Sequence, residues 1–226
     1  MSGPSSLCRE IEAALHPSGI LLRGTADFDA GEGPFLAHGG RAASVLLFGN
    51  VGGSIWPAFS EWRQSYEGPH PLDTWSKEII RPLAEKYGGT AYFPSDPPWQ
   101  PFQQWAMRAE RLKPSPLGIL IHPEYGLWHG YRGAIGFPWA VGRDVTIGRH
   151  ACDVCETKPC ITTCPVGAID IDPAKFALRD CRSHLRTQAG REGCMVSGCL
   201  ARNACPVGAE YRYPPEQLRF HMESLG

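Results

Sequence analysis

Up to about residue 148, apolar positions alternate between helical spacing and short strand-like runs. Helical spacing predicts four helices, at residues 5–16, 55–66, 72–87 and 102–112. Short apolar runs predict strands at 20–28, 43–48, 90–93 and 117–121 and a further one within 125–137. Loops rich in glycine and proline, at 29–40 and 94–101, separate them. This order of strands and helices predicts a layered α+β domain over residues 1–148.

From residue 149 onward, cysteines replace the apolar pattern as the main feature. Eight of the nine cysteines lie in two runs, Cys152-x2-Cys155-x4-Cys160-x3-Cys164-Pro165 and Cys181-x12-Cys194-x4-Cys199-x5-Cys205-Pro206. Thiolates are soft ligands, and a 4Fe-4S cluster needs four of them around one centre. The spacing therefore predicts a small two-cluster ferredoxin-like domain over residues 149–226, joined to the first domain by a link at 142–148.

Both runs end in Cys-Pro-Val-Gly-Ala, at 164–168 and 205–209, which indicates an internal duplication. In such two-cluster modules the fourth cysteine of each run binds the other cluster. One 4Fe-4S cluster is therefore assigned to Cys152, Cys155, Cys160 and Cys205, and the other to Cys181, Cys194, Cys199 and Cys164. A short strand at 168–172 and a helix or cap at 214–226 complete the predicted module.

Two other uses of these cysteines are less favoured. Disulfides require an oxidising compartment, and the N-terminus has no basic run followed by an apolar stretch. Structural zinc commonly uses paired C-x2-C knuckles, of which Cys152 and Cys155 form the one example here. Binding of iron–sulfur clusters is therefore the preferred interpretation of the eight cysteines.

Composition narrows the function classes. With 42% apolar residues the chain can form a packed core, and no apolar run approaches the roughly 18 residues of a membrane span. A formal net charge of −1 offers no basic field, so nucleic acid is not expected as a partner. The protein is expected in the cytoplasm, without a membrane partner.

Two stretches of the first domain suggest ligand chemistry. The glycine-rich loop 49–54 follows a strand, as phosphate-binding loops do, but it matches neither G-x-G-x-x-G nor the Walker pattern, so a tight turn is favoured. Residues 121–133, Ile-His-Pro-Glu-Tyr-Gly-Leu-Trp-His-Gly-Tyr-Arg-Gly, combine histidines, aromatic rings, an arginine and glycines. Such a segment suits a large flat ligand, or equally a hairpin whose rings belong to the core.

The pattern Ile-His-Pro-x-x-Gly-x-Trp-x-x-x-Arg-Gly resembles the corresponding stretch of the cobalamin-processing CblC family, which removes the upper axial ligand of vitamin B12. A weaker likeness extends over about residues 10–137. The resemblance implies a flavin-reductase or nitroreductase-like α/β sandwich that binds a corrinoid, cobalamin, as cofactor or substrate. Similar corrinoid domains precede two-cluster ferredoxin modules in epoxyqueuosine reductase and in reductive dehalogenases.

By this resemblance the cobalamin pocket is expected to contain His122, Gly126, Trp128, Arg132 and Gly133, together with His129 and Tyr131, which occupy variable positions of the motif. No catalytic side chain is assigned. The likeness ends after Gly133, where the cysteine module begins, so glutathione-dependent chemistry is not carried over.

Together, the two halves predict an oxidoreductase that binds cobalamin and reduces its cobalt through two 4Fe-4S clusters, a cobalamin reductase or decyanase. Its electrons are expected from a soluble low-potential donor, a flavodoxin, a ferredoxin or a flavin reductase. One alternative is an electron carrier with two clusters and no corrinoid. Another is a corrinoid- or flavin-dependent reductase of an organic substrate.

Overall fold

The computed structural model describes residues 4–142 and 149–225 and divides the chain into two compact units. One unit, the sheet unit, is Met1–Arg111 with Gly130–Ile147, and the other, the cysteine unit, is Leu112–His129 with Gly148–Gly226. Residues 112–129 thus pack with the cysteine runs, whereas the sequence analysis places them in the first domain. Apart from Gly142, the predicted link at 142–148 lies outside the described residues.

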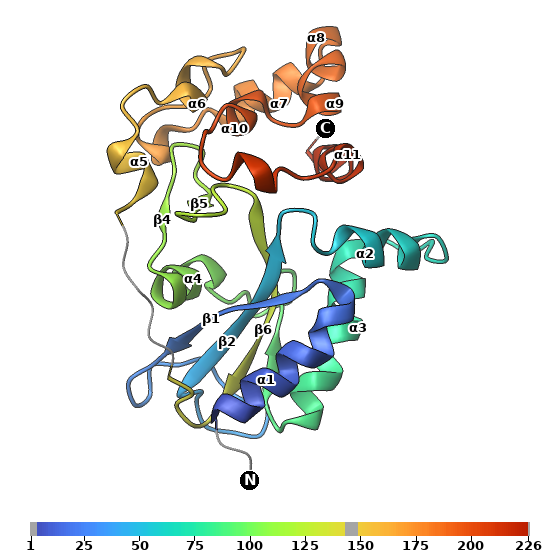
Figure 1. The fold of residues 1–226 in the computed structure, drawn as a ribbon, viewed down its shortest axis with the longest axis vertical. Coiled ribbons are helices and arrows are strands. Elements are labelled where there is room, and N and C mark those ends of the chain that lie inside the picture. Colours follow the sequence, from blue (N-terminus) through green and yellow to red (C-terminus); the bar gives the residue numbers. More distant parts are fainter. Residues whose placement is uncertain (1–3, 143–148, 226) are drawn as a thin grey trace. The chain divides into compact units, whose positions relative to one another are not determined.

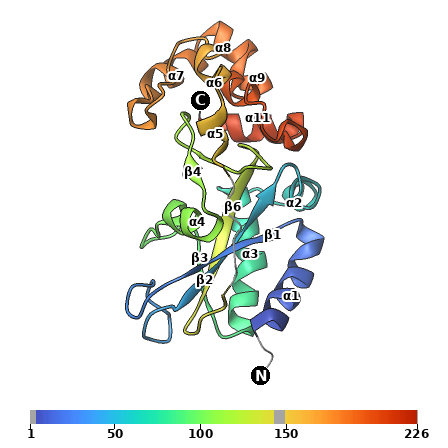
Figure 2. The same cartoon turned by 60° about the vertical axis from the view of Figure 1, so that its left-hand side comes forward.

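The sheet unit contains a four-stranded sheet in the order β1-β2-β6-β3. Its strands are β1 Leu21–Asp27, β2 Ser44–Val51, β3 Thr90–Tyr92 and β6 His129–Phe137, and the pairs β1–β2 and β3–β6 are antiparallel. Helices α1 (Pro4–Leu15) and α3 (Pro71–Lys86) lie on one side of the sheet and α4 (Phe102–Glu110) on the other (Figures 1 and 2). Helix α2 is Trp56–Arg63, and a short 3-10 turn covers His16–Ser18.

This layering follows from the apolar pattern of the strands. Every residue of β2 from Ser44 to Asn50 is buried, as expected of a strand covered on both faces. Side chains of Trp75 and Ile80 from α3 and Trp105 from α4 are buried as well. The mixed α+β class predicted from the sequence is confirmed.

The cysteine unit consists of short elements. The antiparallel strands β4 Lys113–Pro114 and β5 Leu120–Ile121 contain two residues each. The helices are α5 Ala151–Val154, α6 Pro159–Thr162, α7 Leu178–Leu185, α8 Gln188–Glu192, α9 Cys194–Ser197, α10 Leu200–Asn203 and α11 Pro215–Glu223, with 3-10 turns at Pro173–Lys175 and Ala209–Tyr211. None of the helices within the described residues is long and apolar enough to cross a bilayer.

Two predicted strands differ from the structure. The strand at 168–172 is wrong, because Asp170 and Asp172 accept hydrogen bonds from the backbone N–H groups two residues later and so form side-chain-capped turns. The strand at 117–121 shrinks to Leu120–Ile121, because a turn closed by Ser115 occupies its first half.

A buried ion pair joins the sheet to α4. The register of β1 shifts between Leu22 and Gly24, and the intervening Arg23 forms two hydrogen bonds with the carboxylate of Glu110, at 3.0 and 3.1 Å. A third bond comes from the Tyr131 hydroxyl, 2.5 Å from Glu110 Oε2. Burial raises the pKa of Glu110, while Arg23 and Tyr131 oppose that shift. The β-bulge thus turns a charged side chain inward, where it finds its partner.

Replacing Glu110 by glutamine should lower the free energy of unfolding by about 3–5 kcal/mol, because the Arg23 charge would remain buried without its counter-ion. The measurement is urea unfolding of both proteins near neutral pH. The exposed Glu85→Gln on α3 is the control and should change stability by less than about 0.5 kcal/mol. Equal losses in the two variants would contradict this assignment.

Candidate metal centres

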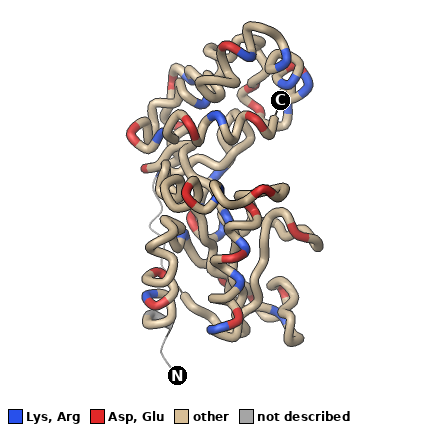
Figure 3. The backbone as a smooth tube through the Cα atoms, turned by 90° about the vertical axis from the view of Figure 1, so that its right-hand side faces the viewer, with Lys and Arg blue, Asp and Glu red and all other residues tan. Residues whose placement is uncertain are grey.

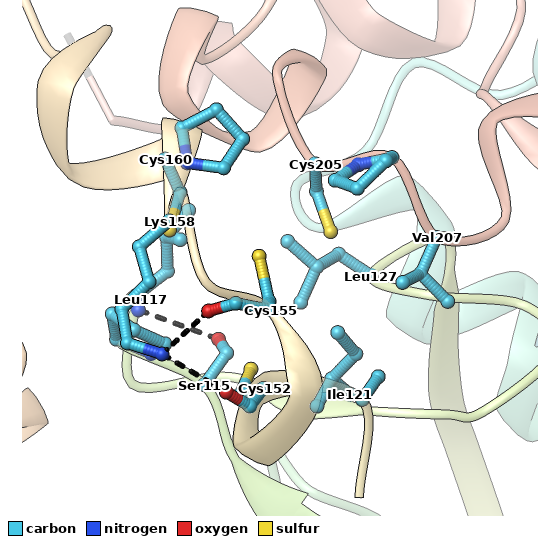
Figure 4. Close-up of a pocket in the computed structure, with 14 residues that line it drawn as sticks. Ser115, Leu117, Ile121, Leu127, Cys152, Cys155, Lys158, Cys160, Cys205 and Val207 are labelled. Carbon is cyan, nitrogen blue, oxygen red and sulfur yellow. Dashed lines mark hydrogen bonds between the residues drawn. The ribbon is translucent and has the colours of Figure 1, made fainter.

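The fold gathers four of the predicted ligands around one hollow of the cysteine unit. Cys152 lies in α5, Cys155 just after it, Cys160 in α6 and Cys205 after α10, and all four line the same hollow. The sulfurs of Cys155 and Cys205 point into a common space (Figure 4). The surrounding wall is largely apolar, with Leu117, Ile121, Leu127 and Val207.

The other four cysteines, Cys164, Cys181, Cys194 and Cys199, line a second hollow of the same unit. Its volume is about 240 Å³, against about 30 Å³ for the first. The wall is again mainly apolar and includes Ile169, Phe176, Leu185, Leu218 and Met222. Each hollow therefore collects three cysteines from one run and one from the other, as the cross-over arrangement requires.

Electrostatic coupling between the thiols follows the same grouping. Burial, and then the nearby thiols of Cys205, Cys160 and Cys155, raise the pKa of Cys152 to about 11. In the second hollow burial, followed by Cys199, Cys164 and Cys194, raises the pKa of Cys181. Thiols in this setting keep their protons unless a cation replaces them.

The donor sets fit a cationic iron–sulfur core. Each hollow presents four soft ligands around a mainly apolar space. Thiolates this close repel one another, and bound iron would reduce that repulsion. Among the described residues, no three His, Cys, Asp or Glu side chains gather closely enough to hold a single metal ion.

Backbone N–H groups also point at the sulfurs. The N–H of Ala168 donates to Cys164 Sγ at 3.3 Å. Backbone hydrogen bonds from Ile161 to Cys160, from Arg202 and Ala201 to Cys199 and from Val207 to Cys205 oppose the rise in these three thiol pKa values. Hydrogen bonds to sulfur stabilise thiolates and are one of the means by which proteins set cluster potentials.

Lys158 fixes the loop between the first two helices of this unit. Its backbone has φ 40°, in the left-handed region, and its ammonium donates to the carbonyl oxygens of Cys152 and Cys155 at 3.0 and 2.8 Å (Figure 4). The same charge opposes the rise in the pKa of Cys152. The spacing of the cysteines gives no signal for this role, because the contact depends on the fold of the loop.

The residues expected in a cobalamin pocket divide between the two units. His122, Gly126, Trp128 and His129 belong to the cysteine unit. The His122 ring stacks on Tyr125, and its Nδ1 accepts hydrogen bonds from two backbone N–H groups. His129 Nε2 lies 3.1 Å from the carbonyl oxygen of Leu120. Trp128 is fully buried against Tyr213, so these side chains contact their own unit.

Tyr131, Arg132 and Gly133 lie on β6 in the sheet unit. The Tyr131 hydroxyl donates a hydrogen bond to the buried carboxylate of Glu110. A side chain at Gly133 would bring its Cβ within 2.7 Å of the Ile80 side chain, so this glycine permits close packing of β6 on α3. Arg132 is half-buried. A role for these seven residues in holding cobalamin stays a prediction.

Gly126 positions the Cys205 loop. Its φ is +56°, and a Cβ at this position would lie 1.9 Å from the carbonyl oxygen of Val207, two residues after Cys205. This close approach holds the hairpin that carries Trp128 against the last cysteine of the second run.

Gly126→Ala should displace that loop and lower the iron bound by reconstituted protein, by up to about half if one of two clusters is lost. Iron and sulfide analysis is the measurement. Gly118→Ala is the matched control, since Gly118 has φ +75° in the same unit but open space at its Cβ position. It should cost about 1–2 kcal/mol of stability and leave the iron content intact. Similar iron contents in both variants would contradict the packing argument.

Cluster assembly should become more favourable as pH rises. Bound iron requires thiolates, whereas the raised pKa of Cys152, about 11, keeps this thiol protonated in the folded protein at neutral pH. Below that pKa each unit of pH raises the thiolate fraction about tenfold. The measurement is anaerobic iron uptake at about pH 6.5, 7.5 and 8.5, with proton release followed by an indicator dye. Uptake that is independent of pH and releases no protons would contradict the expectation.

Comparison with known proteins gives a likeness of fold. A scan against family models and a search of curated proteins both find no match. The chain is similar to the solved structure of epoxyqueuosine reductase from Streptococcus thermophilus, with 14% identity and a TM-score of 0.52 over 76% of this chain and 51% of that one. At this identity the likeness describes the fold.

Two further epoxyqueuosine reductase structures are similar at lower TM-scores. One, with a tRNA-Tyr epoxyqueuosine-modified stem loop, has 17% identity and a TM-score of 0.47 over 78% of this chain and 54% of that one. The other, from Bacillus subtilis, has 15% identity and a TM-score of 0.46 over 77% and 51%. The chain thus spans about half the length of the solved structures it matches.

The exclusion of nucleic acid as a partner is corrected by this comparison, because one of the similar structures contains a tRNA stem loop. Net charge is a poor guide here. The value of −1 averages over both units, whereas binding depends on the local distribution of charge. Basic and acidic residues are interspersed along the backbone (Figure 3).

Proposed function

We propose that this chain is an iron–sulfur reductase that holds two 4Fe-4S clusters and delivers electrons to the cobalt of a bound cobalamin, releasing its upper axial ligand. The observation that supports this most is the pair of hollows, each lined by four thiols drawn from both cysteine runs. The corrinoid part is supported by the resemblance of residues 121–133 to the CblC family and by the likeness of fold to epoxyqueuosine reductase.

The roles of the chain's own residues follow from the site. Eight thiolates would hold the clusters, apolar walls would limit water, and the backbone N–H groups would adjust the cluster potentials. When bound, the clusters supply single electrons at low potential. One electron added to the cobalt(III) of the substrate weakens its upper bond, and a ligand such as cyanide leaves with its electron pair.

The proposed arrangement is a nitroreductase-like corrinoid domain followed by a ferredoxin-like module, working in the cytoplasm. A flavodoxin, a ferredoxin or a flavin reductase would supply the electrons. In this proposal electrons pass from the donor through the clusters to the cobalt.

A second candidate is an electron carrier with two clusters and no corrinoid. It is favoured by the internal partners of the expected pocket residues, since Trp128 packs on Tyr213 and the Tyr131 hydroxyl bonds to Glu110. A corrinoid- or flavin-dependent reductase of an organic substrate is the third, favoured by the likeness of fold to epoxyqueuosine reductase.

Paired substitutions test the two clusters and their cross-over. Wild-type protein, reconstituted anaerobically, should bind about eight iron and about eight sulfide. Cys155→Ala with Cys205→Ala removes two ligands of one proposed cluster and should retain about half of the iron. Cys155→Ala with Cys164→Ala removes two members of the first run, one from each proposed cluster, and should lose nearly all of it. If Cys155→Ala with Cys164→Ala retains as much iron as Cys155→Ala with Cys205→Ala, or more, the cross-over is rejected. Wild-type protein without iron would reject the clusters.

Visible spectroscopy tests the corrinoid. Oxidised, reconstituted protein should shift the absorption bands of added hydroxocobalamin. A reduced flavodoxin system should then convert bound cyanocobalamin faster with wild-type protein than with the Cys155→Ala, Cys164→Ala variant, which controls for direct reduction by the donor. Absence of any binding shift would favour the electron carrier, whereas binding with equal rates would exclude a role for the clusters in reduction.

A further inference from the structure

Arg202 lies beside the second group of cysteines. It belongs to α10, three residues after Cys199, and its side chain lines the same hollow as Cys181 and Cys194. Among the described residues that line this hollow, Arg202 is the one side chain with a permanent charge, and the lining contains no Asp or Glu. A positive charge therefore adjoins the space that the four thiols surround.

Aromatic rings hold this guanidinium in place. Its central carbon lies 4.5 Å from the ring centroid of Trp128 and 4.7 Å from that of Tyr213. One terminal nitrogen donates a hydrogen bond to the carbonyl oxygen of Leu127. Stacking of this kind fixes the plane of the guanidinium as well as its position. Trp128 is the tryptophan of the motif assigned to cobalamin, and it supports Arg202 within the cysteine unit.

The charge of Arg202 lacks a counter-ion in the described part of the chain. No carboxylate there forms an ion pair with it, and its Nε atom is buried without a hydrogen-bond acceptor. Arg23, the comparable arginine of the sheet unit, is bound by both oxygens of Glu110. A buried donor on a cation costs free energy unless negative charge is supplied nearby.

We propose that Arg202 supplies the positive charge that stabilises the reduced state of the cluster in the second hollow, and so raises its reduction potential. Reduction adds one electron to the cluster, forms and breaks no bond, and increases the negative charge that faces Arg202. Nearby charges and hydrogen bonds to sulfur are two of the means by which a protein shifts the reduction potential of an iron–sulfur cluster. Arg202 is thus a positioning residue for electron transfer, and the inference rests on the proposed function because it requires a cluster in this hollow.

The test is an anaerobic redox titration of the full chain with dithionite, followed by electron paramagnetic resonance. Arg202→Met should keep the iron content and lower one of the two midpoint potentials. At a fixed potential the ratio of reduced to oxidised cluster should fall at least about tenfold, which is about 59 mV for a one-electron couple. Arg202→Lys should show a smaller shift. The exposed Arg191→Met on α8 is the control and should leave both midpoints unchanged.

Unchanged midpoints in Arg202→Met with full iron content would overturn the inference and leave the proposed function standing. If Arg202→Met cannot hold the second cluster, Arg202→Gln and Arg202→Lys decide. If Arg202→Met and Arg202→Gln lose that cluster but Arg202→Lys keeps it, the cluster requires the positive charge, which supports the inference. If Arg202→Lys loses it too, the shape of the side chain is what matters, and the inference is overturned. Wild-type protein that binds no second cluster would overturn both the proposed function and the role of Arg202.

Discussion

The cysteine unit depends on bringing eight thiols into two small apolar hollows. Burial and mutual repulsion raise the pKa of thiols in both groups, so their anionic forms are unfavourable without added positive charge. The unit has only short elements of secondary structure to offset that cost. Its helices within the described residues run from four to nine residues, and β4 and β5 have two residues each. A bound metal core would therefore contribute to the stability of the fold as well as to its chemistry.

Residues 112–129 contribute to the surroundings of both groups of thiols. They leave the sheet unit after α4, contribute Leu117 and Ile121 to the wall of the first hollow, and place Trp128 beside Arg202. The close approach of Gly126 to Val207 holds this hairpin against the Cys205 loop. A segment that resembles part of a corrinoid motif thus also shapes the surroundings of the thiols.

In the sheet unit, charge is balanced internally. The β-bulge at Arg23, the end of α4 at Glu110 and the Tyr131 hydroxyl form one buried network. Such a network is costly to break but contributes little net stability, so its main effect is to fix the position of α4 against the sheet. Arg202 differs from Arg23 in having no carboxylate partner among the described residues, and its guanidinium is held by aromatic stacking instead.

The sequence by itself determined the elements and the chemistry of the ligands. Helical spacing located α1, α3 and α4, short apolar runs located β1 and β2, and the Cys-Pro repeats predicted which cysteines gather at each hollow. These features are local, or are repeated, and so are visible in one dimension. The tertiary structure decided the membership of residues 112–129, the absence of a strand at 168–172 and the partners of Trp128 and Tyr131. The first and last of these depend on contacts between residues more than 20 positions apart, for which the spacing of side chains along the chain carries no signal. The turns at 168–172 are local, and they arise because the Asp170 and Asp172 side chains bond to the backbone two residues later.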